Sequence, residues 1–215
     1  MDHESGGRDE VCGIERRRFL ALALTVVIAL SSIGCVATSD YMYQPATPVV
    51  PEPRSDTALV VFVRPSAYAA SIAMTILDGN GRFLGDSLAE SYFAVQVPPG
   101  NHLFIGWAEN TAAVQAHLAP GRTYYVEVAP RMGWWSARIQ LLALTPGSEN
   151  WGKLSEWLRE SDFYVVDEAR GQAYLRERSE DTRERIRRGN DILTEYDNEE
   201  LAERTIRPED GVQAR

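Results

Sequence analysis

Cysteine and histidine are scarce in this sequence, and several common catalytic motifs are absent from it. The 215 residues include two cysteines, Cys12 and Cys35, and three histidines. No His-Glu-x-x-His, Gly-x-Ser-x-Gly or Gly-x-x-x-x-Gly-Lys-Ser/Thr pattern occurs. Thiol chemistry and thiolate zinc sites are therefore excluded for the chain after Cys35, and no disulfide can form there. We expect no enzymatic activity, no catalytic residues, no metal and no cofactor.

Basic residues are fewer than acidic ones. Lys and Arg number 22 against 31 Asp and Glu, which leaves a formal net charge of −9. A surface that binds nucleic acid needs clustered positive charge to displace the counterions of the phosphates. We expect no nucleic acid partner, and no electrostatic attraction to anionic lipid.

A basic stretch followed by an apolar one leads to Cys35. Arg16–Arg18 precede the apolar run Phe19–Leu30, and small residues then lead to Gly34 and Cys35. This order is typical of a secretion signal. Ser32-Ile33-Gly34-Cys35 resembles the lipobox of bacterial lipoproteins, although leucine is commoner at the position of Ser32. The resemblance implies a signal peptide over residues 1–35, lipid such as palmitate on Cys35, and a membrane-anchored body that faces the periplasm from the inner or outer membrane.

Two features of this leader leave alternatives open. The apolar run is shorter than the roughly 20 residues that a spanning helix needs, so a signal segment fits better than an uncleaved anchor helix. Arg16–Leu20 also resembles a twin-arginine export signal, and the route of export stays open.

Prolines dominate residues 36–56, at Pro45, Pro48, Pro51 and Pro53. Proline fixes its own backbone and biases the preceding residue towards extended geometry, so this segment is expected to be a semi-rigid tether. The alternative is an irregular segment that lies on the following domain, because Tyr41 and Tyr43 offer aromatic surface for docking.

Short apolar runs separated by glycine or proline turns fill residues 57–148. The expected strands are 58–64, 71–77, 82–85, 92–97, 101–107, 112–118, 123–128 and 135–144. The first run is apolar throughout, as in a strand covered on both faces, and Asp78-Gly79-Asn80-Gly81 is a hairpin signal. This spacing predicts a mainly β protein, with an antiparallel β-sandwich of about seven strands.

One hairpin register can be worked out from the sequence. If Trp107 pairs with Ala112, His102 faces His117, and the two imidazoles could hold a metal or respond to pH near about 6.5. A catalytic zinc needs a third protein ligand, which the sequence does not nominate. An ordinary cross-strand pair is therefore the expectation.

Several turn and packing motifs follow in a fixed order. They are Arg64-Pro65, Asp78–Gly81 with Gly85, Phe93–His102 and Leu118–Val126. Together they resemble the PEGA-like and carboxypeptidase-regulatory-like β-sandwich domains, over about residues 57–145. The resemblance implies an accessory domain that binds, spaces or scaffolds and has no shared catalytic residues.

Residues 149–215 differ in composition and are expected to form a charged helical extension. Trp151, Leu154, Trp157 and Leu158 share one face of a short helix that packs on the sandwich, and Phe163–Val166 could add an edge strand. From residue 168 to 188 the chain is highly charged, with opposite charges four apart at Arg176/Glu180, Asp181/Arg185 and Glu184/Arg188. Its few apolar residues predict a solvated appendage; the alternative is a docking helix for an envelope protein partner.

Trp134 and Trp135 are the candidate binding residues. They follow a turn and are expected at one end of the sandwich, where adjacent side chains of a strand cannot both point inward. The alternative places one indole in the core and the other over a loop. We therefore expect a non-enzymatic, lipid-anchored envelope protein with a structural or interaction role; the alternative is a module that binds glycan or peptide through these aromatics.

Overall fold

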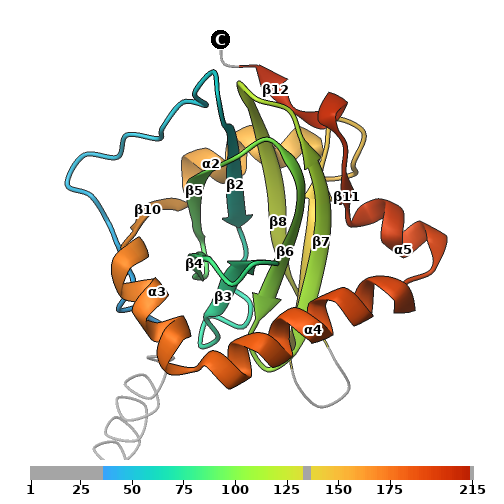
Figure 1. Ribbon diagram of the computed structural model, residues 1–215. Helices are drawn as coiled ribbons and strands as arrows, with labels where there is room; N and C mark the ends of the chain where they lie inside the picture. The colour runs from blue at the N-terminus through green and yellow to red at the C-terminus, as the bar shows by residue number, and fades with distance from the viewer. Residues whose placement is uncertain (1–35, 133–136, 214–215) are drawn as a thin grey trace, which may run out of the picture. The chain divides into compact units, whose positions relative to one another are not determined.

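The computed structural model describes residues 36–132 and 137–213 and is mainly β, with two mixed sheets (Figure 1). The first sheet has the order β1 (Met42–Tyr43), β10 (Asp162–Val166), β5 (Ser91–Val97), β2 (Ala58–Arg64) and β8 (Arg122–Met132), and both β9 (Ala137–Leu144) and β12 (Val212–Gln213) pair with β8. The second has the order β11 (Thr205–Ile206), β7 (Thr111–Leu118), β6 (Gly100–Trp107), β3 (Met74–Asp78) and β4 (Phe83–Ser87).

Strand β2 is the centre of the first sheet, and all seven of its residues are buried. Val60 and Phe62 contribute to the core that the two sheets share, whereas Leu59, Val61 and Val63 belong to a second cluster on the opposite face. The prediction of a strand covered on both faces is confirmed.

Aromatic rings join the two sheets in the shared core. The ring of Phe62 stacks on that of Phe93, with centroids 5.1 Å apart, and meets the ring of Phe104 edge-on at 5.6 Å. Phe62 and Phe93 lie on the first sheet and Phe104 on the second. Such pairs add about 0.5–1.5 kcal/mol each beyond the burial of their area.

The hairpin predicted at Asp78–Gly81 is confirmed between β3 and β4. The carboxylate Oδ1 of Asp78 accepts hydrogen bonds from the backbone N–H groups of Asn80 and Arg82, at 2.8 and 2.9 Å. Gly81 has a φ of +82°, which a residue without a Cβ adopts at little cost.

The purely antiparallel arrangement expected from the sequence is wrong. Three pairs are parallel: β2 with β8, β10 with β5, and β11 with β7. Parallel neighbours cannot be joined by a tight turn and must come from distant parts of the chain. Turn motifs reveal only the hairpins, so the sequence analysis overlooked these pairs.

The histidine pairing is also wrong, by one residue of register. The loop between β6 and β7 has three residues, 108–110, so Trp107 pairs with Thr111 and His117 lies opposite Asn101. The side chains of His117 and Asn101 are hydrogen bonded, while Nε2 of His102 lies 2.8 Å from the carbonyl oxygen of Pro98. Because the side-chain period of a strand is two residues, this one-residue shift changes which face each residue occupies.

The C-terminal part is not a separate extension, since β10, β11 and β12 pair with strands of the predicted sandwich region. The boundary at 148/149 therefore does not exist in the structure. Helices α3 (Glu168–Glu177) and α4 (Ser179–Glu195) pack against the second sheet, α3 on β4 and α4 on β6 and β7 (Figure 1). The predicted solvated appendage is thus wrong for both helices.

Two glycines allow this close packing of helix on sheet. A Cβ on Gly171 would lie 2.1 Å from a ring atom of Phe83, and one on Gly189 would lie 2.7 Å from Ile105. Leu175 supplies a buried apolar anchor, at 2% exposure, beside Phe83 and Ile105. A helix with few large apolar residues can therefore still bury one face.

The short helix predicted around Trp157 is confirmed. It consists of a 3₁₀ turn, η1 (Trp151–Lys153), and α2 (Leu154–Glu160), which pack on the outer face of the first sheet beside Val61. Two further short helices follow α4, namely α5 (Asn198–Glu203) and η2 (Pro208–Asp210). No helix in the described ranges has the length and hydropathy needed to span a membrane.

Residues 41–43 of the proline-containing segment lie on the domain. The ring of Tyr41 packs 5.0 Å from that of Tyr174 and 5.7 Å from that of Phe83, centroid to centroid. Met42 is buried and pairs with Val166 of β10. These contacts favour the docked alternative over a free tether for this part of the segment.

Candidate functional site

The three site residues predicted from the sequence lie outside the described residues. Cys35 precedes Val36, the first described residue, and Trp134 and Trp135 fall between β8 and β9. Lipid attachment at Cys35 and binding by the tryptophans therefore stay predictions.

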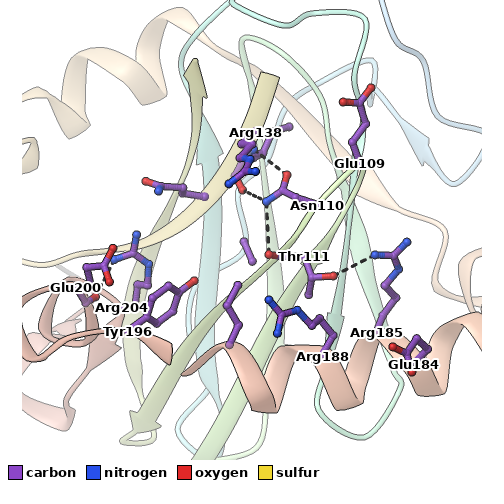
Figure 2. Close-up of a pocket in the computed structure, with 14 residues that line it drawn as sticks. Glu109, Asn110, Thr111, Arg138, Glu184, Arg185, Arg188, Tyr196, Glu200 and Arg204 are labelled. Carbon is purple, nitrogen blue, oxygen red and sulfur yellow. Dashed lines mark hydrogen bonds between the residues drawn. The ribbon is translucent and has the colours of Figure 1, made fainter. Parts of the chain in front are cut away.

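One cavity among the described residues has a volume of about 650 Å³ (Figure 2). It lies where β7 and β9, strands of different sheets, are covered by α4, α5 and the link between them. Its lining comprises Glu109–Ala112, Arg138–Gln140, Glu184, Arg185, Arg188, Ile192, Tyr196, Glu200 and Arg204. Sequence positions almost a hundred residues apart thus meet in one cavity, which we call the arginine cavity.

Asn110 fixes one wall of the arginine cavity. Its side-chain Nδ2 donates to the carbonyl oxygen of Ile139 at 2.9 Å, and its Oδ1 accepts from the N–H of Ile139 at 3.0 Å. The amide therefore joins the β6–β7 loop to the edge of β9 as a neighbouring strand would. This contact holds the start of β7 beside Arg138.

Arg185 connects α4 to the same wall. Its Nη1 donates to Oγ1 of Thr111 at 3.1 Å, and its guanidinium carbon lies 5.2 Å from the ring centroid of Trp107. Both partners are uncharged, so the positive charge of Arg185 is positioned without being neutralised by an ion pair among the described residues.

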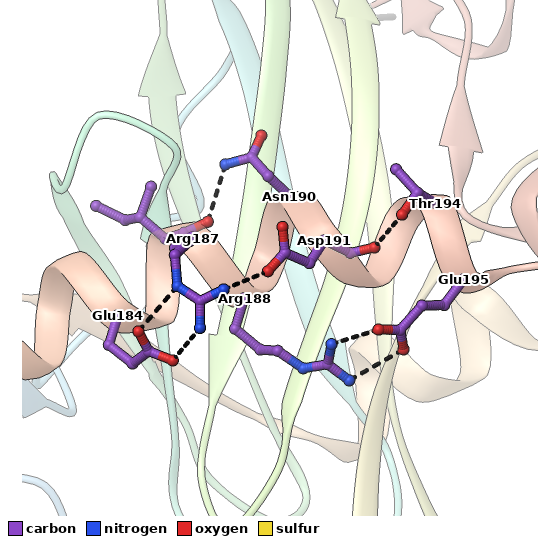
Figure 3. Close-up of polar contacts among 8 residues, drawn as sticks. Glu184, Arg187, Arg188, Asn190, Asp191, Thr194 and Glu195 are labelled. Atoms are coloured by element: carbon purple, nitrogen blue, oxygen red, sulfur yellow. Dashed lines mark hydrogen bonds and ion pairs between the residues drawn. The ribbon is translucent and has the colours of Figure 1, made fainter.

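The carboxylates along α4 pair in a different pattern from the one expected (Figure 3). Arg187 bonds Glu184 at 2.6 Å and Asp191 at 2.7 Å, while Arg188 forms a two-bond pair with Glu195. None of the three predicted pairs, Arg176/Glu180, Asp181/Arg185 and Glu184/Arg188, is among the ion pairs of the described residues. The hydrogen bond from Arg187 is the main cause that lowers the pKa of Glu184, so this cavity carboxylate is already engaged outside the cavity.

Arg204 forms the other end of the arginine cavity. Its side chain is 3% exposed, its Nη1 donates to the carbonyl oxygen of Glu200 at 2.7 Å, and its guanidinium lies 4.4 Å from the ring centroid of Tyr196. The nearest carboxylate oxygen is that of Glu203, at 3.6 Å. Its Nε is buried without a hydrogen-bond partner among the described residues. Burial is the main cause that raises the pKa of the Tyr196 hydroxyl, and Arg204 partly offsets it.

The charges of this cavity determine what it can do chemically. Four arginines and three glutamates line it, but Glu184 is paired with Arg187, and Glu200 accepts a hydrogen bond from the N–H of Asp197 at 3.2 Å. Arg138 is exposed, and its side chain has no hydrogen bond or ion pair within the described ranges. Arginine stays protonated at any physiological pH and presents a fork of N–H donors. The cavity is therefore equipped to hold an acceptor group and to keep it in place, not to transfer a proton.

Two further cavities are present among the described residues. The described part of the chain has no cluster of three His, Cys, Asp or Glu side chains that could hold a metal. A second cavity, of about 540 Å³, contains Glu127, whose pKa is raised by burial and partly restored by a hydrogen bond from Asn150. A third, of about 460 Å³, lies between Val50–Pro53 and the outer face of the first sheet and is mainly apolar.

The sequence analysis did not identify the arginine cavity. Arg138, Arg185, Arg188 and Arg204 have no common motif, because they come from three elements that meet only in the folded chain. The single local signal is the i, i+3 spacing of Arg185 and Arg188, which places them on neighbouring positions of one helix face. No family model, curated protein or solved structure matches this chain.

Proposed function

We propose that this chain is a lipid-anchored cell-envelope protein that acts by binding a ligand or partner and catalyses no reaction. The lipid is attached at Cys35, the body faces the periplasm from the inner or outer membrane, and the two sheets form a β-sandwich of the PEGA-like kind. The order of Arg16–Arg18, the apolar run and Ser32–Cys35 supports the anchor.

One observation carries the binding role: a cavity of about 650 Å³ is lined by guanidinium groups, three of which neighbouring residues hold in place. Thr111 positions Arg185, Glu195 positions Arg188, and the ring of Tyr196 supports Arg204. Fixed donors of this kind bind oxygen acceptors, whereas general acid–base catalysis needs a group whose pKa lies near the working pH.

The anchor is tested by mass spectrometry of the N-terminus and by membrane fractionation, comparing the wild type with Cys35→Ala. We expect a lipid-modified Cys35 as the first residue of the wild type, and release of Cys35→Ala from the lipid-modified fraction. An unmodified Cys35 with residues 1–34 still attached would refute the lipoprotein proposal.

The binding role is tested by capture of partners from native membranes with full-length protein. Truncation after Thr145 is unsuitable, because it would remove β10 and its parallel pairing with β5. We propose instead to compare the wild type with Arg138→Gln/Arg185→Gln, and to use Arg183→Gln, an exposed change on the same helix, as the matched control. Partners that are lost only from the double variant support binding at the cavity; an unchanged partner set refutes it.

The exposed face of α4 offers a second surface for an envelope protein partner, as the charged C-terminal region suggested. Glu184, Arg187 and Asp191 lie on it, and each is between 45 and 61% exposed. They already pair with each other, so a partner would have to compete with those ion pairs. This makes the arginine cavity the stronger candidate.

A further inference from the structure

We propose that the arginine cavity binds a small ligand that carries two or more oxygen-acid groups, carboxylate or phosphate. One group would lie near Arg204 and another near Arg185, and Arg138 lines the same cavity. This inference deepens the proposed binding role by naming the chemistry of the ligand, and it rests on that role.

The donor on Arg204 is the first argument. A buried N–H without an acceptor costs about 1–3 kcal/mol, more when the group is charged, and folded proteins contain few of them. The Nε of Arg204 is such a donor, in a side chain that lines the cavity and is 3% exposed. The carboxylate of Glu203, at 3.6 Å from Nη1, lies too far away for a good hydrogen bond. Because this Nε has almost no accessible area, a ligand oxygen in the cavity would bind the guanidinium of Arg204 and reach Nε only with a shift of that side chain.

The second argument is the balance of charge. Arg138 and Arg185 have no carboxylate partner among the described residues, whereas Glu184 and Glu200 are engaged by Arg187 and the N–H of Asp197. Four arginines against three glutamates leave the lining with an excess of one positive charge, in a chain whose net charge is −9. A protein of that sign repels anions in general, so a concentrated group of guanidiniums selects for anions at this one place.

The arrangement of the arginines sets the number of anionic groups. Figure 2 shows Arg204 beside Tyr196 at one end of the cavity, Arg185 beside Thr111 at the other, and Arg188 between them. A guanidinium fork and a carboxylate or phosphate group commonly form a two-bond pair, and the arginines of this cavity are spread along its length. A ligand with two separated anionic groups can use both ends at once.

The volume of the cavity and the carboxylate of Glu109 narrow the class of ligand further. A volume of about 650 Å³ suits a metabolite-sized molecule, in the range of about 300–1,000 Å³ that small-molecule sites occupy. Glu109 also lines the cavity and has no ion-pair partner in the described ranges, so it opposes a ligand of very high negative charge. This favours a small di- or trianion over a polyanion such as nucleic acid.

The test is isothermal titration calorimetry with full-length protein in uncharged detergent, at fixed low ionic strength. The probes are citrate for the carboxylate class, pyrophosphate for the phosphate class, and acetate as a single-charge comparison. We expect citrate or pyrophosphate to bind and acetate to bind far more weakly. The probe that binds more tightly identifies which oxygen acid the site prefers.

The variants separate binding at the cavity from general attraction. We expect Arg138→Gln and Arg185→Gln each to weaken the better probe about tenfold or more, since each removes a charge-assisted contact. Arg183→Gln should bind as the wild type does. Circular dichroism melting without anion checks that all three variants stay folded, and Arg138 is exposed, so its variant is not expected to unfold.

Three outcomes would overturn the inference: no heat with either multivalent probe, equal binding by the wild type and the cavity variants, or an equal loss in Arg183→Gln. The partner capture described above distinguishes this failure from failure of the proposed function. If the cavity variants lose a membrane partner but no anion binds, the binding role stands and the ligand class is wrong. If the anions bind as expected but capture is unchanged, the ligand class stands and the partner role is wrong.

Discussion

The side chain of Arg64 is a buried charged group in this fold. It is fully buried at the end of β2, and it donates to the carbonyl oxygens of Ile72 at 2.6 Å, Ala69 at 2.7 Å and Tyr68 at 3.1 Å. A weaker contact reaches the carbonyl oxygen of Ser87 at 3.4 Å. The described residues place no carboxylate in an ion pair with it, and burial lowers its pKa. Arg64 therefore holds the loop between β2 and β3 through backbone carbonyls alone.

Replacement of Arg64 by methionine would remove a buried charge and leave these carbonyls without their donor. Each unsatisfied buried acceptor costs about 1–3 kcal/mol, which is reduced where water can reach it. Tyr68 is 43% exposed, so its carbonyl can recover a partner, whereas Ser87 is buried. Relief from burying the guanidinium offsets part of the cost. We expect Arg64→Met to lower the free energy of unfolding by about 3 kcal/mol.

Lysine at this position separates charge from geometry. The ammonium group of lysine retains the charge, but it cannot donate to all the carbonyls that the two terminal nitrogens of the planar guanidinium reach. We therefore expect Arg64→Lys to lower the free energy of unfolding by at least about 2 kcal/mol. The measurement is urea unfolding followed by tryptophan fluorescence, with the exposed Arg183→Met as the control, expected within about 0.5 kcal/mol of the wild type. A loss below about 1 kcal/mol in Arg64→Met, or wild-type stability in Arg64→Lys, would refute this reasoning.

Three further predictions concern buried groups and close contacts. Burial raises the pKa of Asp86 despite hydrogen bonds from Ser39 and Thr75. A raised folded-state pKa adds stability that is complete below the ordinary carboxyl pKa and is lost as the pH rises through the raised value. The unfolding free energy of the wild type should therefore increase relative to that of Asp86→Asn as the pH falls from 7 towards 4. A difference in unfolding free energy that does not change with pH would contradict this. Gly171→Ala should destabilise by about 2 kcal/mol in urea unfolding, although alanine normally favours a helix, because the Cβ would strike the ring of Phe83; a gain in stability would contradict the packing. Gly189→Ala should lower the thermal midpoint by less than Gly171→Ala does, because its Cβ meets a flexible isoleucine side chain. A larger fall in the midpoint of Gly189→Ala than in that of Gly171→Ala would contradict this ranking.

The sequence predicted the elements whose signals are local. The apolar run Ala58–Arg64, the hairpin at Asp78–Gly81 and the helix around Trp157 all occur where expected, because propensity, turn chemistry and periodicity depend on residues near each other in the chain. The predicted lipid site at Cys35 is equally local, and it depends on a recognition motif rather than on the fold.

Contacts between distant segments decided the rest. The parallel pairing of β2 with β8 joins residues about sixty positions apart, and no turn motif marks it. A loop shorter by one residue moved His117 from His102 to Asn101, since register depends on the exact number of loop residues.

The packing of the charged C-terminal helices also could not be predicted from local sequence. Their sequence has too few large apolar residues to predict burial, yet Gly171 and Gly189 let them approach the second sheet, and the side chains that fill the gap belong to that sheet. The arginine cavity follows from this placement, because α4 brings Arg185 and Arg188 to the wall that carries Arg138. The sequence by itself determined the strands between residues 58 and 144 and the turns that join them. The tertiary structure decided which strands are neighbours, added the short strands β1, β11 and β12, and determined which charges meet, because those depend on contacts that no local pattern encodes.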